Sequence, residues 1–420
     1  MMKMNVSLQR VGQLALATAA VGAFMATAIP EADAARRASL AQNRLILDTN
    51  DVYLFPQVAV EYTNHVRFDY GGVTGSGSGL ALLGDDSMAF GIGVFRGDLL
   101  DPDFYPYNLG HPNLGNISNP LGGFTDNYDA PHTIIDLFGA FDLGGGLAGV
   151  RLSLGNGGER DVSIQGETNS NSQTFVAANL GYSLLGDMRI DTGLRLQFAT
   201  GSVVDGDDDL NSGSDFLLGL TLRGFSPLSE TVDLGFLADV AFSTGSSTLF
   251  GDPDLDQDDR TERNSAILAA LGAGPAYDID GVTTIAGYGV LGFQRTTEDP
   301  DTSEDDDRTF DSSFIVPGVH IAADIQLLEW LYFRSGMQYN FQIDTETEEQ
   351  DIEGIDDAVR DTTVDSSRDS NFGWRAGVGI QVDNFTLDGA FQTGFILNGP
   401  DFLGGAGGGM FTMVTAGYTF

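Results

Sequence analysis

Apolar side chains alternate with small or charged ones in segment after segment of this chain. Between residues 188 and 198, for example, Met188 and Ile190 fall on one face of an extended chain, and Arg189 and Asp191 fall on the other. Successive side chains of a β-strand point to opposite faces, so a strand of this kind separates an apolar environment from a polar one. The pattern predicts an all-β fold whose two faces meet different solvents.

The alternating pattern recurs along the chain, in segments close to the roughly 9 to 11 residues that a tilted strand needs to cross a membrane. The sixteen segments run over residues 65–72, 78–84, 87–97, 131–143, 145–155, 173–185, 188–200, 215–227, 231–244, 264–277, 282–295, 310–327, 331–344, 371–382, 385–397 and 409–420. We therefore expect a transmembrane antiparallel up-and-down β-barrel over residues 65–420, with about 16 strands and both ends of the wall in the periplasm. Because the segment 78–84 is short, 14 strands is the alternative.

The connections between these segments alternate strictly between two kinds. The short ones are Gly84–Asp86, Gly144–Gly146, Gly186–Asp187, Pro227–Glu230, Asp278–Gly281, Leu328–Trp330 and Val382–Asn384. The long ones run over about Asp98–Pro131, Asn156–Gln173, Gly201–Asp215, Gly245–Arg263, Thr297–Arg308, Thr345–Asn371 and Asn398–Gly408. Short periplasmic turns opposite long extracellular loops are typical of an outer-membrane barrel. A soluble β-sandwich has no reason to sort its loops in this way.

Acidic residues are concentrated in the long connections. The formal net charge is -40, although only 19% of the residues are charged. The densest clusters are Asp205–Asp209, Asp252–Asp259, Glu298–Asp307 and Glu346–Asp361. We therefore expect long acidic extracellular loops. The chain contains no cysteine, which excludes a disulfide framework, a cysteine-ligated metal site and a lipid-anchored N-terminus.

One acidic cluster has the spacing of a possible cation site. Carboxylates at every second position can turn several oxygens toward one hard cation such as Ca²⁺. The residues concerned are Asp252, Asp254, Asp256 and Asp258. The match to an EF-hand loop fails, since Gln257 stands where glycine is needed and Arg263 where the bidentate glutamate should be. A solvated acidic loop is the alternative, and divalent ions bridging the loops to anionic lipid, or a saline habitat, would explain the acidity equally well.

Residues 1–34 have the pattern of a secretory signal peptide. Lys3 and Arg10 supply a positive start, a mostly apolar stretch follows, and Ala32-Asp33-Ala34 fits the small-x-small cleavage rule. No run of eighteen apolar residues follows Ala34, so the mature chain is expected either to be soluble or to span the membrane as a barrel. Residues 35–64 precede the first alternating segment and are expected to plug the lumen or to hang below it in the periplasm.

The polar faces of the segments carry ionisable residues at positions that belong in water, since an isolated charge facing lipid costs about 2 to 4 kcal/mol at mid-depth. These candidate pore-lining residues are Arg67, Asp69, Arg151, Arg189, Asp191, Arg195, Arg223, Asp233, Asp239, His320, Asp324, Arg334, Arg375 and Asp388. One interpretation is a conduit whose charges create a transverse field that orients solutes; the other is a salt-bridged interior that stiffens a closed barrel. A barrel of this size encloses more space than side chains fill, which favours the conduit.

The sequence offers little support for an enzyme. Gly287-Tyr-Gly-Val-Leu-Gly292 has the letters of a dinucleotide fingerprint but lies inside an alternating segment with no helix after it. The four histidines show no metal-ligand spacing, and no GxSxG nucleophile elbow is present. We therefore expect no catalytic activity and no cofactor, apart from the possible Ca²⁺ in the acidic loops.

The last residues run Met410-Phe-Thr-Met-Val-Thr-Ala-Gly-Tyr-Thr-Phe420. An aromatic end of this kind resembles the signal that bacterial barrel-assembly machinery recognises, which would involve Tyr418 and Phe420. With its signal peptide and sixteen-segment pattern, the chain resembles the porin-like outer-membrane proteins of diderm bacteria. A more limited likeness links Asp48-Thr-Asn-Asp51-Val-Tyr-Leu-Phe-Pro56 to the segment ahead of the barrel in the long-chain fatty-acid transporter family, although Phe55-Pro56 stands where that family has Asn-Pro.

The resemblance implies a protein of the cell outer membrane whose partners are outer-membrane lipid, the assembly machinery and small solutes. A homotrimer is possible, and nucleic acid is not expected as a partner. The predicted function is passive diffusion of small solutes through a charged lumen. Two alternatives are a transporter of hydrophobic substrates occluded by residues 35–64, and a structural or adhesin barrel that conducts nothing.

Overall fold

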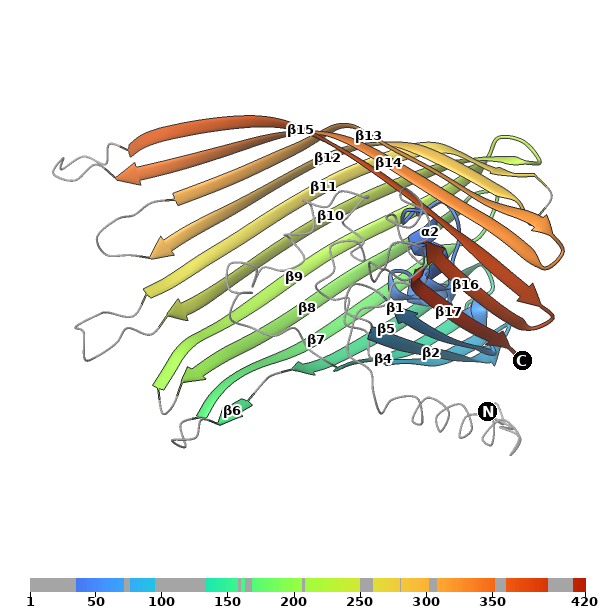
Figure 1. Cartoon of the computed structure of the whole chain (residues 1–420), viewed down its shortest axis with the longest axis horizontal. Helices are drawn as coiled ribbons and strands as arrows, with labels where there is room; N and C mark the ends of the chain where they lie inside the picture. The colour runs from blue at the N-terminus through green and yellow to red at the C-terminus, as the bar shows by residue number, and fades with distance from the viewer. Residues whose placement is uncertain are drawn as a thin grey trace, which may run out of the picture.

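The computed structural model describes residues 35–71, 76–94, 133–157, 160–162, 168–205, 208–249, 260–279, 281–301, 308–351, 360–391 and 411–420. Within them, seventeen strands form one antiparallel sheet that closes on itself, because the last strand pairs with the first (Figure 1). The predicted all-β barrel is thereby confirmed. The predicted signal peptide, residues 1–34, lies outside the described residues.

The strands follow one another around the wall in chain order. They are β1 (His65–Gly71), β2 (Ser76–Asp85), β3 (Met88–Val94), β4 (Thr133–Asp142), β5 (Gly146–Gly157), β6 (Arg160–Val162), β7 (Thr168–Leu184), β8 (Arg189–Asp205), β9 (Asp208–Pro227), β10 (Val232–Leu249), β11 (Arg260–Asp278), β12 (Thr284–Asp301), β13 (Arg308–Leu328), β14 (Leu331–Asp351), β15 (Arg360–Val382), β16 (Phe385–Phe391) and β17 (Phe411–Thr419). The three-residue β6 pairs with β7 beside the wall, while β5 pairs with β7 directly, so sixteen strands make the barrel. The alternative of 14 strands is wrong, because the short segment forms β2.

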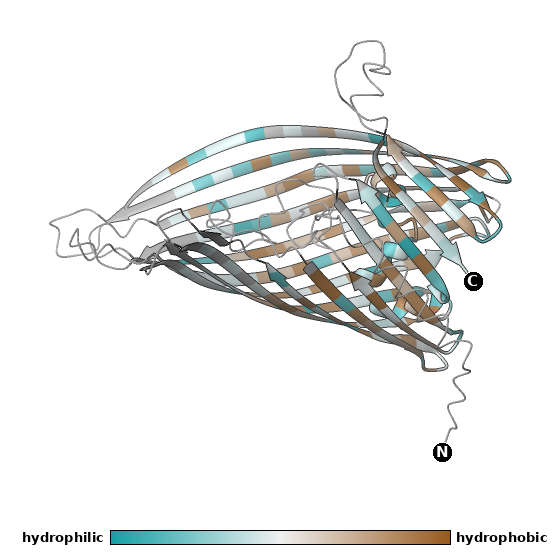
Figure 2. Cartoon of the chain, turned by 60° about the horizontal axis from the view of Figure 1, so that its bottom comes forward, coloured by the Kyte–Doolittle hydropathy of each residue, from teal (hydrophilic) through white to brown (hydrophobic). Residues whose placement is uncertain are grey.

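Hydrophobic and hydrophilic residues alternate along the strands, as the banded colouring of Figure 2 shows. Because successive side chains of a strand point to opposite faces, this alternation separates them between the two faces of the wall. In β8, Leu194 and Phe198 are 36% and 50% exposed, whereas Arg195 and Gln197 between them are only 4% and 6% exposed. A closed sheet satisfies its own backbone hydrogen bonds, and an apolar outer face suits it to lipid. The chain is therefore a β-barrel of the outer membrane.

Among the described residues, no helix has the length and apolar character needed to cross a membrane.

The observed strand ends agree with the predicted ones at the short turns and differ from them at the long loops. The prediction begins a strand at residue 371, but β15 begins at Arg360, and its first residue pairs with Asp351 at the end of β14. The predicted loop Thr345–Asn371 is therefore largely a hairpin. Backbone hydrogen bonds can pair two strands whatever their side chains are. The outer parts of β14 and β15 are mostly polar, so they lack the alternation of apolar residues on which the prediction depends.

The N-terminal segment, residues 35–62, lies inside the barrel toward the end that carries the short turns and the C-terminus (Figure 1). It contains α2 (Ala35–Ser39) and two 3-10 helices, η2 (Thr49–Tyr53) and η3 (Pro56–Tyr62). Leu45 packs in one buried cluster with Leu237 of β10, and Phe55 packs in another with Leu80 of β2. Apolar contacts therefore connect the segment to distant parts of the inner wall.

Candidate functional site

Asp51 is the central charge of the interface between the N-terminal segment and the wall. Its Oδ1 lies 2.6 Å from Nη1 of Arg37 in the same segment, and its Oδ2 lies 2.7 Å from Nη1 of Arg223 on β9. The side chains of Asp51 and Arg223 are each 1% exposed. The guanidinium of Arg223 also lies over the ring of Phe55, 4.7 Å from its centroid. A carboxylate so buried is stable only with charged partners, and here it has one on each side.

The local fold of η2 fixes the direction of this carboxylate. Asp48 is the N-cap residue, and its side chain accepts a hydrogen bond from the backbone N–H of Asn50 at 2.9 Å. Asp51 accepts one in return from the backbone N–H of Asp48 at 3.1 Å, which completes a capping box. The carboxylate of Asp51 thus caps the N-terminus of a short helix and also binds the wall.

Arg223 extends the network along the wall to β8. It donates to Asp191 Oδ2 at 2.9 Å, and Asp191 also accepts from Ser183 and from Arg189. Arg189 in turn donates to Glu61 of η3 at 2.9 and 3.0 Å. Both side chains of this last pair are partly exposed, so solvent screens their attraction and removing one partner costs little.

A second chain of ion pairs begins at Asp48. Arg36 lies 2.7 Å from Asp48 and 2.9 Å from Asp324 of β13, and Asp324 is also 3.0 Å from Arg334 of β14. Arg334 then donates to Asp388 of β16. Burial alone would raise the pKa of Asp48, but the charge of Arg36 and the hydrogen bond from the Asn50 N–H hold that pKa below its usual range. Asp48 is therefore ionised where the segment is seated.

Two further contacts join the segment to the wall. Arg44 lies 2.5 Å from Asp239 of β10, and both side chains are almost fully buried. Arg67 of β1 donates to the hydroxyl of Thr49 at 2.7 Å and to Asp69 at 3.0 Å. Ion pairs or hydrogen bonds thus join residues 36–61 to β1, β8, β9, β10 and β13.

The other candidate pore-lining residues lie elsewhere on the wall. Arg151 is buried, donates to Asn179 at 3.1 Å and lies over the ring of Tyr53. Arg195 is buried against Gln197. His320 is buried and stacks on Tyr288 with ring centroids 4.8 Å apart.

Asp233 is partly buried beside a cavity of about 450 Å³ at the short-turn end, and Arg375 is exposed. The candidate Ca²⁺ ligands Asp252, Asp254, Asp256 and Asp258 lie outside the described residues. Within those residues, no group of three or more histidine, aspartate or glutamate side chains has an arrangement that could hold a metal ion. Tyr418 and Phe420 are 49% and 38% exposed, with their rings stacked, at the end of the barrel seam.

Sequence reasoning missed the charges on the segment that face the wall. Asp48 and Asp51 stand in the motif that carries the likeness to fatty-acid transporters, but as sequence they gave no indication of their partners. Arg36, Arg37 and Arg44 were the available signal, since they are three of only 20 basic residues in the chain. Basic residues so scarce and so close together ahead of an acidic motif could have indicated an ion-paired segment.

The segment also touches the wall backbone closely at glycines. A Cβ at Gly336 of β14 would come within 2.6 Å of the backbone nitrogen of Ala41. A Cβ at Gly149 of β5 would come within 2.5 Å of the Cα of Gln57. These glycines leave room for the segment, which fits the wall too tightly there for any side chain.

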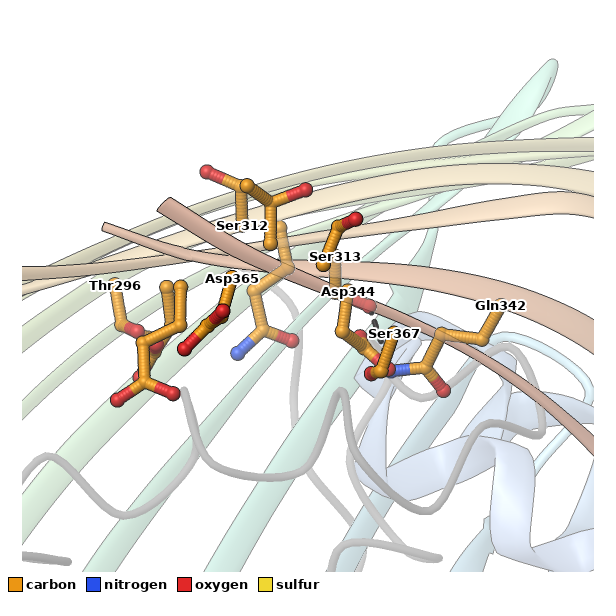
Figure 3. A pocket seen from close by; sticks show the side chains of 12 residues that line it. Thr296, Ser312, Ser313, Gln342, Asp344, Asp365 and Ser367 are labelled. Carbon is orange, nitrogen blue, oxygen red and sulfur yellow. Dashed lines mark hydrogen bonds between the residues drawn. The ribbon is translucent and has the colours of Figure 1, made fainter. Parts of the chain in front are cut away.

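Farther along the barrel, the inner faces of β12 to β15 form a polar cavity of about 630 Å³ (Figure 3). Its acidic residues are Asp311, Asp344, Glu346 and Asp365, and the rest of its lining is serine, threonine and glutamine. The register places Asp311 opposite Glu346 and Glu346 opposite Asp365, so their side chains share a face of the sheet. Among the described residues, no basic side chain lines this cavity, which gives it a negative potential.

No protein-family model and no curated protein matches the chain. Solved structures with a similar fold include the ferric yersiniabactin uptake receptor FyuA from Yersinia pestis, at 9% identity over 78% of this chain and 68% of that chain, with a TM-score of 0.37. The CymD monoaromatic hydrocarbon channel is 7% identical over 92% of this chain and 97% of that chain, with a TM-score of 0.35. The transport unit of the autotransporter AIDA-I from Escherichia coli is 14% identical over 67% and 93%, with a TM-score of 0.30. At these values the likenesses assign no substrate to this chain.

Proposed function

We propose that this barrel passes small solutes across the outer membrane and that residues 35–62 act as a plug that must leave its seat for passage. The observation that carries the proposal is the bridge of Asp51 to Arg37 and Arg223, a segment carboxylate held by a wall arginine in the barrel interior. This function combines a charged lumen with occlusion by the N-terminal segment. A permanently open diffusion channel is the hypothesis with which it competes. We propose no catalytic role for the chain.

The chemistry of the seat supports a plug that can move. Buried ion pairs cost desolvation energy that their attraction repays only in part, so they hold a segment less tightly than an apolar interface of similar size. When the segment leaves, water can solvate the arginines and carboxylates on both sides. The charged contacts make the seat specific because each charge has its partner, and they can be broken because water replaces those partners. The apolar contacts of Leu45 and Phe55 with the wall must be broken as well.

The polar cavity between β12 and β15 supports polar rather than purely apolar solutes. Its carboxylates, among them Asp311 and Asp344, would draw cations into the lumen and slow the entry of anions. A solute of this class would then meet the seated segment farther along the barrel.

A disulfide lock tests the proposal, because the chain has no cysteine of its own. Ala38 of α2 and Ala390 of β16 share a buried cluster, so the double variant Ala38→Cys, Ala390→Cys is designed to form a bridge between the segment and the wall. In planar bilayers with potassium chloride, we expect current steps from the reduced form and few or none from the oxidised form. Mass spectrometry establishes that the bridge has formed.

A bridge within the wall is the matched control. Ser172 of β7 and Ser202 of β8 are directly paired, with hydroxyl oxygens 2.9 Å apart, and Ser172→Cys, Ser202→Cys should conduct alike when oxidised and reduced. If the bridged Ala38–Ala390 variant conducts as well as its reduced form, the seated segment does not occlude the barrel, and the open diffusion channel is favoured. If neither form conducts, the structural or adhesin barrel is favoured.

A further inference from the structure

The first described residue of the segment lies at the seam of the barrel. The backbone N–H of Ala35 donates to the hydroxyl oxygen of Thr415 at 2.8 Å, in a buried hydrogen bond. Thr415 in turn donates to Asp69 Oδ1 at 2.6 Å. Thr415 and Asp69 are directly opposite each other in the pairing of β17 with β1, which closes the barrel. The nitrogen of Ala35 is therefore two hydrogen bonds from a carboxylate on the first strand, through a hydroxyl on the last.

The residues around this nitrogen are buried and hydrogen-bonded to one another. Asp69 is 3% exposed and Thr415 is 4% exposed. Asp69 also accepts hydrogen bonds from Arg67 at 3.0 Å and from Ser78 at 3.2 Å, through Oδ2 in both cases. Its other oxygen, Oδ1, is the one that connects through Thr415 to Ala35.

The sequence places the predicted signal-peptide cleavage after Ala34, immediately before this residue. Hydrolysis of the Ala34–Ala35 peptide bond by a signal peptidase consumes one water molecule. The carboxylate leaves on Ala34, and the released amine of Ala35 takes up a proton. The group at the seam then changes from an amide with one N–H donor to an ammonium with three.

We propose that removal of residues 1–34 creates an α-ammonium group on Ala35 that docks at Thr415 and Asp69, so that processing anchors the first residue of the N-terminal segment to the first and last strands of the barrel. An ammonium makes stronger hydrogen bonds than an amide, because a charged donor shortens and strengthens the bond to its acceptor. The new charge also faces a buried carboxylate across one hydroxyl. The unprocessed chain lacks both contributions, so its segment is held less firmly at the seam.

This inference goes beyond solute passage, and its test measures how fast the Ala35 amine reacts with a chemical reagent rather than a current. The mature protein, folded in detergent, is treated with an acylating reagent near neutral pH, and mass spectrometry follows modification of the N-terminal peptide. We expect the Ala35 amine to be acylated at least about tenfold more slowly than in the same protein unfolded in urea, since the docked amine is protonated and hydrogen-bonded. A mature N-terminus at another residue, or equal rates in the two states, would overturn the proposal.

Variants on β17 separate docking from simple burial. Thr415→Val keeps the shape of the side chain but removes the hydroxyl, and should restore most of the reactivity. Thr415→Ser keeps the hydroxyl and should stay protected, which also covers the case that the valine variant folds poorly. Thr412→Val is the matched control, since the Thr412 hydroxyl bonds only to the carbonyl of Ala390 among the described residues. If the two valine variants protect Ala35 equally, the hydroxyl does not hold the amine, and the proposal fails whether or not the barrel conducts.

Discussion

Neutralising Asp51 should unseat the N-terminal segment with little change in its shape. The substitution Asp51→Asn is nearly isosteric, and the new side chain still offers an oxygen to the backbone N–H of Asp48, so η2 keeps its cap. What the substitution removes is the negative charge between Arg37 and Arg223. Removing one partner of a buried ion pair costs about 3 to 5 kcal/mol, because the other charge stays buried without compensation.

That cost applies to the seated state alone, because water solvates the arginines once the segment leaves. A change of about 1.4 kcal/mol is tenfold in an equilibrium constant, so the ratio of displaced to seated segment should rise between about a hundredfold and a few thousandfold. The ion pair of Arg223 with Asp191 remains in this variant, so we expect an increase toward the lower end of that range. In single-channel recordings, Asp51→Asn should open far more often than the unmodified protein, and a protease added from the segment's side should cut residues 35–62 sooner.

Glu61→Gln is the matched control for this prediction. Glu61 also pairs with a wall arginine, Arg189, but the two side chains are 31% and 20% exposed. Exposed pairs contribute about 0 to 1 kcal/mol, so this variant should change opening by about fivefold at most. If Asp51→Asn opens no more often than Glu61→Gln while its barrel remains folded, the buried charges do not hold the segment, and the reasoning is refuted.

Three further predictions follow from the same geometry. Because the pKa of Asp48 is lowered in the seated state, its contribution to seating is complete above its ordinary pKa of 3.8 and is lost as the pH falls below that value, so protease cleavage of the segment should accelerate only in that acidic range. Gly336→Ala should displace the segment and increase opening in bilayers, whereas Gly139→Ala, whose Cβ would meet nothing closer than 3.7 Å, should leave it unchanged. Neutralising Asp311 and Asp344 together should lower the cation preference measured from reversal potentials in a salt gradient, and an unaltered preference would mean that ions bypass this cavity.

The wall was predictable from sequence because its signals are local. Each of the sixteen alternating segments overlaps one strand of the barrel, and each short turn stands where glycine, proline or acidic residues interrupt the pattern. The outer ends of the strands were not predictable in the same way. In β14 and β15 the pairing runs on to Asp351 and Arg360 through mostly polar residues, where both faces meet water and alternation loses its meaning.

In the candidate site, the wall residues were predictable from the sequence, but their partners on the N-terminal segment were not. Alternation identified Arg223, Asp191 and Asp239 as residues of the inner face, since that needs only their phase along a strand. Their partners could not be identified in this way, because Asp51 is 172 residues from Arg223 in sequence. Nothing local to η2 indicates which strand it faces. Sequence reasoning could name residues 35–64 as a candidate plug, but only the fold shows which charges meet.

The charges of the segment also bear on what opening would do to the lumen. Residues 35–62 contain three arginines and three carboxylates, which are Arg36, Arg37, Arg44, Asp48, Asp51 and Glu61. These six side-chain charges sum to zero, so the departure of the segment changes the net charge of the interior only by the α-ammonium charge proposed for Ala35. It exposes separate wall arginines and aspartates that were neutralised by contact, and these would then create the transverse field expected of a charged conduit. The two interpretations of the inner charges, a salt-bridged interior and a solute conduit, would therefore describe the same residues with the segment seated and with it displaced.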